Sequence, residues 1–201
     1  MAKTILIATT NKGKLSEIYA LLTGVKAILT SPGDISLSLE VEESGLTYSE
    51  NARLKASAFC KASGLPALAD DSGLEVELLD GMPGLHSARF SSNMNATDAD
   101  RRALLLEKLK ALPQPWKARF VCTMALAIPA GGIHFSSGVC TGKIIPIERG
   151  DFGFGYDPIF MCENTNQTMA ELLMEEKNRI SHRARAAAGM LPILLAYLRK
   201  T

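Results

Sequence analysis

Residues 3–22 read KTILIATTNKGKLSEIYALL, and they contain one complete structural unit. Lys3–Thr9 is apolar and rich in β-branched residues, which is typical of a buried strand. Lys14–Leu22 carries its apolar residues at helical spacing on one face, and the polar turn TTNKG joins the two segments. A strand that runs through a short turn into a helix opens an α/β unit, so we predict an α/β fold.

Helix starts are predicted by sequences of the capping-box type, in which Ser or Thr precedes an acidic residue by three positions. On this basis we expect helices over 47–63 and 97–112, and one that starts at Thr168 and runs towards Lys177. A last helix is expected from Ser181. Pro192 lies inside that helix and is expected to kink it or break it locally.

Strand-like runs occupy the middle of the chain. They cover Ala67–Ala69, Leu74–Leu79, Arg119–Pro129 and Ile133–Ile147, and Gly131-Gly132 between the last two indicates a hairpin. We expect the first of these strands to end at Ala69, so that two adjacent carboxylates follow at its carboxyl end. The whole chain, 1–201, is predicted to be a single domain without a separate linker, since it shows no repeat or low-complexity tract.

The composition excludes several classes of protein. The 201 residues include 22 Lys+Arg and 21 Asp+Glu, a net charge of +1, which argues against a protein that coats a nucleic acid polymer. Hydrophobic residues make up 47% and charged residues 21%, which disfavours disorder. No apolar run is long enough for a membrane span or a signal peptide, and the four cysteines form no CxxC pair. We therefore expect a cytoplasmic protein with reduced, mostly buried thiols and without a zinc site.

The turn TTNKGK, residues 9–14, is a candidate anion site. It places backbone N–H groups, hydroxyls, an amide and ammonium groups at a helix N-terminus, where the helix dipole favours negative charge. It is not a Walker A loop, because the GxxxxGK[ST] pattern is absent. The alternative interpretation is an ordinary helix cap by Thr10 or Asn11 beside a solvated lysine.

Carboxylates form a second candidate group. Asp70 and Asp71 are adjacent, and neighbours on a strand point to opposite sides, so one would face a ligand and the other would support it. Glu42 or Glu43 would complete an oxygen ligand set for Mg²⁺. The alternatives are an Asp-rich surface turn and a solvated Glu pair. Lys55 follows on the next helix, where a lysine usually extends to the surface.

The segment FGFGYDP, residues 152–158, interleaves three aromatics with glycines and suits a loop that folds over a flat ligand such as a base. The alternative is a loop packed under a hydrophobic lid. Further along, His182 and Arg183 fall in the first turn of the last helix, where cations oppose the dipole unless an anionic or carbonyl-bearing ligand lies nearby. Taken together, these groups converge on a metal-bound nucleotide.

These motifs resemble one known family. TTNKGK, ENARLKA, LADDSGLEV, GxPG…SARF, FGFGYDPIF and EEKNRISHR occur in this order between about Lys3 and Leu198. In this order and spacing they closely resemble the inosine triphosphate pyrophosphatase family, whose bacterial branch comprises the XTP/dITP diphosphatases. The resemblance implies an elongated α/β fold with a long central mixed sheet flanked by helices, and two lobes with a substrate cleft between them.

The resemblance also implies an activity. Members hydrolyse non-canonical purine nucleoside triphosphates (dITP, ITP and XTP) to the monophosphate and pyrophosphate, with Mg²⁺ as cofactor, and so cleanse the nucleotide pool of deaminated purines. They are typically homodimers. By the motif matches, Asp71 is the general base, Glu42 and Asp71 bind the metal, and Asp70 is a supporting acid. The implied substrate contacts are Thr9, Thr10, Asn11, Lys12, Gly13, Lys14, Lys55, Ser72, Phe154, Gly155, Tyr156, Asp157, Lys177, His182 and Arg183.

Two other functions stay open at this point. A nucleotide-sensing module that has lost catalysis is disfavoured, because a pure binder gains little from carboxylates that face phosphates. A pyrophosphatase for pyrimidine or modified-base triphosphates is disfavoured by the purine-type loop FGFGYDP. Pyrophosphate release from a panel of triphosphates distinguishes all three.

Overall fold

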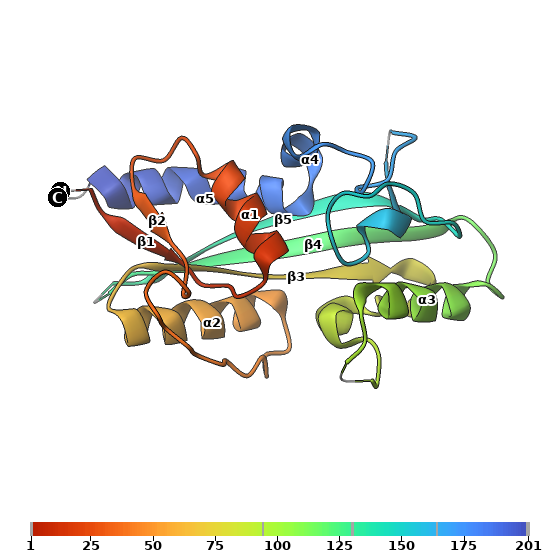
Figure 1. The fold of residues 1–201 in the computed structure, drawn as a ribbon, viewed down its shortest axis with the longest axis horizontal. Helices are drawn as coiled ribbons and strands as arrows, with labels where there is room; N and C mark the ends of the chain where they lie inside the picture. The colour runs from red at the N-terminus through yellow and green to blue at the C-terminus, as the bar shows by residue number, and fades with distance from the viewer. Residues whose placement is uncertain (1, 94, 130, 164, 200–201) are drawn as a thin grey trace. The chain divides into compact units, whose positions relative to one another are not determined.

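The computed structural model describes residues 2–93, 95–129, 131–163 and 165–199 (Figure 1). The described strands form one six-stranded sheet in the order β2-β1-β3-β4-β5-β6. Their bounds are β1 Thr4–Ile7, β2 Ile28–Thr30, β3 Ala67–Val76, β4 Trp116–Ala127, β5 Ile133–Ile144 and β6 Phe160–Cys162. The longer helices are α1 Lys12–Leu21, α2 Tyr48–Ser63, α3 Asp98–Leu109, α4 Met174–Ile180 and α5 His182–Arg199. Because β1 is parallel to β2 and β3 whereas β5 is antiparallel to β6, the expected mixed α/β sheet is confirmed.

The chain divides into two compact units. Unit 1 comprises Met1–Asp71, Cys122–Gly138 and His182–Thr201, and unit 2 comprises Ser72–Val121 and Val139–Ser181. Three of the boundaries fall inside β3, β4 and β5, so these strands contribute residues to both units. No helix in the described ranges combines the length and the apolar character needed to cross a membrane.

In unit 1, α1 and α5 cover one face of the sheet and α2 covers the other (Figure 1). Successive side chains of a strand therefore pack against opposite layers of helices. Leu68 packs with α1 and α5, whereas Ala67 and Ala69 pack with α2. By the same alternation Asp70 points to the side of α1 and α5, and Asp71 points to the side of α2.

Unit 2 has its own core, in which residues of β3, β4, β5 and β6 pack against Leu105 and Leu109 of α3. The single tryptophan, Trp116, is buried there and donates to the carbonyl of Leu112 at 3.1 Å. The aspartate-rich start of α3 is a capping box, since Thr97 Oγ1 accepts from Asp100 N–H at 3.2 Å and Asp100 accepts from Thr97 N–H at 2.8 Å.

The expected strand Ala67–Ala69 is wrong in extent. β3 continues to Val76, so Asp70 and Asp71 lie inside a strand and not after it, and Glu77–Leu79 is a short 3₁₀ turn. The Ser72-Gly73 pair resembles a turn in sequence, yet sheet pairing and the hydrogen bond from Leu74 N–H to Ser87 Oγ, at 2.9 Å, keep the backbone extended.

The helix expected at Thr168 is also wrong, because α4 begins at Met174. Thr168 N–H does donate to Glu171 at 2.7 Å, as in a capping box. However, the Thr168 hydroxyl donates to the carbonyl of Arg149 at 2.8 Å, and the Arg149 side chain binds Glu171 at 2.8 Å. These distant contacts close a turn in place of a helix start.

Other boundaries differ by a few residues. The first helix begins at Lys12, two residues before the predicted start, and β5 ends at Ile144, just before Pro146, which has no N–H to donate to a sheet. The capped helix α2 agrees with its prediction, and α5 continues past Pro192 to Arg199 without interruption. All four cysteines are free and buried, as expected.

Candidate functional site

The phosphate-type turn lies at the start of α1, in unit 1. Asn11 is the helix N-cap, and its Oδ1 accepts from Lys14 N–H at 3.0 Å. Thr9 Oγ1 accepts from Asn11 N–H at 3.2 Å, while Thr10 and Lys12 are exposed. The capping interpretation of Asn11 is therefore correct, and the exposed start of the helix still offers an anion site.

Asp70 is held by cations from both helices on its side of the sheet. Lys14 Nζ lies 3.2 Å from Asp70 Oδ2, and Arg183 donates to the same oxygen at 3.0 Å. The second oxygen, Asp70 Oδ1, is buried and has no hydrogen-bond partner among the described residues. Burial opposes ionisation, but Lys14 and Arg183 outweigh it and hold the pKa of Asp70 well below its usual range. Asp70 is therefore a carboxylate with one oxygen left for a ligand.

Arg183 is almost fully buried, at 1% exposure, and it also donates to Glu17 of α1. Its guanidinium is thus shared between two internal carboxylates. Glu17 does not appear in any of the motifs quoted above. The signal that would have revealed it is a glutamate on the buried side of an amphipathic helix, since such a charge needs a partner. The predicted contact of Arg183 with substrate remains a prediction, and His182 beside it is buried at the start of α5.

Asp71 lies among polar groups of α2, on the opposite side of the sheet. Lys55 Nζ is 3.1 Å from Asp71 Oδ1 and 2.8 Å from Glu43 Oε1. Asn51 Nδ2 donates to Asp71 Oδ2 at 3.2 Å, and Asn51 Oδ1 accepts from Gly45 N–H at 2.8 Å. Sequence reasoning missed Asn51, although a polar residue on the buried face of a helix is a detectable signal.

Burial shifts the pKa of Asp71 in the direction that favours proton acceptance. Desolvation raises the pKa of Asp71, and Lys55 opposes this rise without cancelling it. Desolvation alone would lower the pKa of Lys55, but Asp71, Asp70 and Glu43 raise it. Lys55 therefore remains a cation, while Asp71 moves towards the range in which a carboxylate accepts a proton.

The structure brings Glu43 to this cluster, and leaves the predicted ligand Glu42 exposed. In the described ranges, no group of three or more His, Cys, Asp and Glu side chains forms a complete metal site. Mg²⁺ is usually held by one or two carboxylates together with substrate phosphates. Asp71 and the nearby Glu43, which share Lys55, fit such a partial site, so the residues present suit Mg²⁺ that a ligand's phosphates complete.

The aromatic loop 152–158 lies in unit 2. Asp157 Oδ2 accepts from Lys177 Nζ at 2.5 Å and from Phe154 N–H at 2.9 Å, and both members of the ion pair are buried. Lys177 Nζ also lies 5.3 Å from the centre of the Phe154 ring. This arrangement combines a partly exposed aromatic face with a buried cation, as a base-binding loop requires.

Two predicted contacts are modified by the structure. The Tyr156 hydroxyl donates to the carbonyl of Ser87 at 2.9 Å, and the side chain is buried, so it anchors the loop and does not extend towards a ligand. Ser72 is the first residue of unit 2 and lies within β3. Its predicted contact with substrate remains a prediction.

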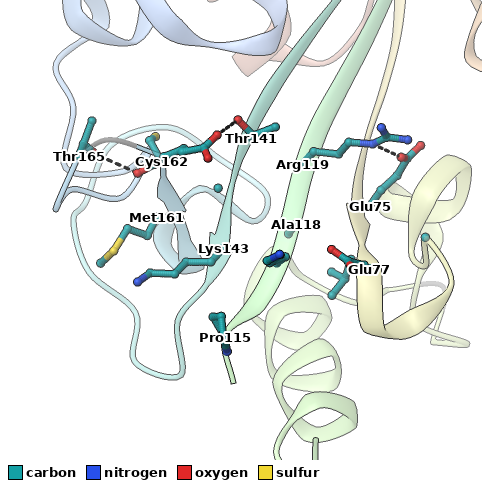
Figure 2. Close-up of a pocket in the computed structure, with 15 residues that line it drawn as sticks. Glu75, Glu77, Pro115, Ala118, Arg119, Thr141, Lys143, Met161, Cys162 and Thr165 are labelled. Atoms are coloured by element: carbon teal, nitrogen blue, oxygen red, sulfur yellow. Dashed lines mark hydrogen bonds and ion pairs between the residues drawn. The ribbon is translucent and has the colours of Figure 1, made fainter. Parts of the chain in front are cut away.

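A groove of about 700 Å³ lies on unit 2, along β3, β4, β5 and β6 (Figure 2). Charged and polar side chains line much of it, and Figure 2 shows the ion pair between Arg119 and Glu75, whose N–O distance is 2.7 Å. None of the predicted site residues lines this groove. We therefore take the carboxylate cluster of unit 1 and the aromatic loop of unit 2 as candidate sites, and we do not assign a site to this groove.

The chain matches the Ham1 family over residues 5–193. A dITP/XTP pyrophosphatase of Geobacter sulfurreducens is 49% identical over 185 residues, which cover 92% of each chain. A protein of the same name from Deinococcus deserti is 47% identical over 188 residues, 94% of this chain and 88% of that protein.

Solved structures agree with these relatives. A HAM1 protein from Coxiella burnetii has a TM-score of 0.86 and 39% sequence identity, with 98% of this chain and all of that chain covered. A nucleoside-triphosphatase / dITP/XTP pyrophosphatase from Mycobacterium abscessus has a TM-score of 0.74 and 42% identity, with 94% and 99% covered.

Proposed function

We propose, from the premise that this chain belongs to the Ham1 family, that it is a nucleoside-triphosphate pyrophosphatase for non-canonical purine nucleotides. The names of its relatives support dITP and XTP as substrates, and the family resemblance implies ITP as well. The proposed products are the nucleoside monophosphate and pyrophosphate. The finer proposals of a Mg²⁺ requirement and a homodimer stand on the family resemblance, and the proposal of a cytoplasmic location stands on the composition of the chain.

One observation carries the proposal: unit 1 holds two adjacent carboxylates, and each is in contact with a lysine. Lys14 lies 3.2 Å from Asp70, and Lys55 lies 3.1 Å from Asp71. A triphosphate brings several negative charges, which need cations, whereas the hydrolysis needs a carboxylate that accepts a proton. A cluster with both kinds of group suits phosphoanhydride hydrolysis better than binding alone.

In the proposed reaction, a water oxygen attacks the α-phosphorus and the bond from this phosphorus to the bridging oxygen breaks. Asp71, which lies beside Lys55 and Asn51, accepts the proton of the water. Lys14 and Lys55 bind phosphate oxygens and stabilise the negative charge of the departing pyrophosphate. Lys14 and Arg183 keep Asp70 ionised, so its second oxygen, Oδ1, can still accept a hydrogen bond.

Asp71 and Glu43 are the residues that would hold Mg²⁺, with Glu42 as the alternative. When bound, the ion would neutralise phosphate charge and polarise the α-phosphate. Arg183 is assigned to holding Asp70, since its guanidinium is engaged by Asp70 and Glu17.

Base recognition is proposed for residues 154–157 together with Lys177. Hypoxanthine and xanthine carry a 6-oxo group, which accepts a hydrogen bond, whereas adenine carries a 6-amino group, which donates. A donor such as the Lys177 ammonium therefore favours the 6-oxo purines, because adenine would leave buried donors unpaired. Phe154 supplies the face on which the base stacks.

The test is a panel of ITP, dITP, XTP, GTP, ATP and a pyrimidine triphosphate, assayed for pyrophosphate with Mg²⁺ and with a chelator. We expect Mg²⁺-dependent pyrophosphate release from ITP, dITP and XTP, and much less from GTP and ATP. Release of orthophosphate instead would contradict attack at the α-phosphorus. Tight ITP binding without turnover would instead identify a binding module, and a preference for the pyrimidine would overturn the base assignment.

A further inference from the structure

Helix α3 is hydrogen-bonded to the aromatic loop at Gly155. Asp98 Oδ2, in the first turn of α3, accepts from Gly155 N–H at 2.7 Å. Arg102, one turn later on the same face, donates to the Gly155 carbonyl at 2.8 Å. All of these residues belong to unit 2. The peptide groups on both sides of the Gly155 Cα are thus bound by a single rigid element.

Asp98 and Arg102 are themselves held in place by neighbouring charged side chains. Arg101 donates to Asp98 Oδ1 at 2.5 Å, and Glu148 accepts from Arg102 through both carboxylate oxygens at 2.8 Å. Only 12% of the Arg102 side chain is exposed. Partial burial opposes ionisation of Asp98, but the hydrogen bonds from Arg101 and Gly155 lower its pKa. Asp98 and Arg102 therefore act as charged partners, which form the stronger class of hydrogen bond.

The backbone of this loop adopts a conformation that few residues other than glycine adopt. Gly155 has φ +63°, and Gly153, two residues before, has φ +78°. A peptide with two glycines in this region has many alternative conformations, so it needs external contacts to hold one of them. Two further contacts fix the ends of the segment: Phe154 N–H donates to Asp157, and the Tyr156 hydroxyl donates to Ser87.

We propose that Asp98 and Arg102 are positioning residues for purine recognition: they fix the Phe154–Asp157 segment in the conformation that distinguishes one purine from another. The inference rests on the proposed function, which makes this segment the base-binding loop. Asp98 and Arg102 belong to unit 2, whereas Lys14, Lys55 and the two aspartates belong to unit 1. The two residues thus set selectivity between bases without taking part in phosphate chemistry.

The test uses Asp98→Ala and Arg102→Ala, with Asp100→Ala as the matched control. Asp100 lies in the same helical turn and forms its hydrogen bonds with Thr97 in place of Gly155, so its loss weakens the start of α3 without releasing the loop. Asp98→Asn is the conservative variant, because its amide oxygen still accepts from Gly155 N–H. Two readouts are measured: amide hydrogen exchange at Gly155, and kcat/KM for ITP relative to GTP.

We expect faster exchange of the Gly155 amide in Asp98→Ala, by about tenfold, which is the effect of losing one hydrogen bond to a charged group. In both alanine variants the preference for ITP over GTP should fall by at least about fivefold, a loss of the same class, mainly through KM. Asp100→Ala should keep the wild-type preference, and Asp98→Asn should regain most of it.

Equal losses on ITP and GTP in the alanine variants, or the same loss of preference in Asp100→Ala, would overturn the inference and leave a purely structural role. Failure of the proposed function looks different: the wild-type protein would release no pyrophosphate from ITP. In that case the amide exchange still reports whether α3 holds the loop, so the two failures are distinguishable.

Discussion

The two clusters differ in what holds them together. In unit 1, Asp70 and Asp71 are held by the charged side chains of Lys14, Lys55 and Arg183. In unit 2, the aromatic loop is held largely through its backbone, since Asp98, Arg102 and Asp157 bind its N–H and carbonyl groups. Side-chain ion pairs can exchange partners when an anion arrives, whereas backbone contacts fix a shape. The ion-paired cluster of unit 1 suits a charged ligand group, and the backbone-bound loop of unit 2 suits a group that is recognised by its shape.

Asp71→Asn should have the largest effect on activity. Loss of the proton acceptor is expected to lower kcat by about 10²–10⁴-fold, the usual contribution of a general base. The fold should stay intact, because desolvation already disfavours the charged form of Asp71, and Lys55 keeps Glu43 as a partner. Pyrophosphate release and urea unfolding measure the two effects. Full activity of Asp71→Asn would refute the assignment of the base.

Arg183→Met should have the largest effect on stability. It leaves Asp70 and Glu17 buried without their shared cation, and breaking a buried pair in this way costs about 3–5 kcal/mol of unfolding free energy. The double variant with Glu17→Gln removes one of the stranded charges and should recover part of the loss. Urea unfolding followed by circular dichroism measures both. A loss of activity without loss of stability would instead favour direct contact between Arg183 and substrate.

The sequence predicted local structure well where the signal was local. The boxes Thr47/Glu50 and Thr97/Asp100 formed as expected because each involves only four consecutive residues. The helix start predicted at Thr168 did not form, because the Thr168 hydroxyl donates to the carbonyl of Arg149, which is 19 residues away. The same reason explains why β3 extends past Asp71, since strand pairing is decided by neighbours distant in sequence.

The candidate site follows the same rule. The residue pattern itself supplied Asp70 and Asp71 as candidates, and the motif resemblance added Lys55 as a substrate contact. Neither supplied the contacts that hold the site together, such as the ion pair of Glu17 with Arg183, which is 166 positions away. The resemblance favoured Glu42 as the metal ligand, whereas the structure brings the adjacent Glu43 to Lys55, because the choice depends on which of the two the folded chain turns towards that lysine.

The pair Glu43→Gln and Glu42→Gln tests that choice and has a smaller expected effect. Glu43 is bound to Lys55, which also binds Asp71, whereas Glu42 is exposed. We expect Glu43→Gln to raise the Mg²⁺ concentration needed for half-maximal activity by about tenfold, as is typical for loss of a group that supports a metal site. Glu42→Gln should change it little. The opposite ranking would restore Glu42 as the ligand and would show that Glu43 serves only to orient Lys55.

The smallest expected effect concerns the loop, where one side chain is removed and the backbone contacts remain. Phe154→Ala should raise KM for ITP by about tenfold, because stacking of a base on an aromatic ring contributes about 1–3 kcal/mol. Phe152→Ala is the matched control, since Phe152 lies in the same loop and is 54% exposed. It should leave KM within about twofold, as is usual for exposed positions. Because Lys177 also lies over the Phe154 ring, removal of the ring tests how strongly this contact helps the ion pair with Asp157 to hold the buried cation. If kcat falls in Phe154→Ala while KM stays constant, the ring acts on the reacting phosphates, and the division of labour between charged cluster and shaped loop is incorrect.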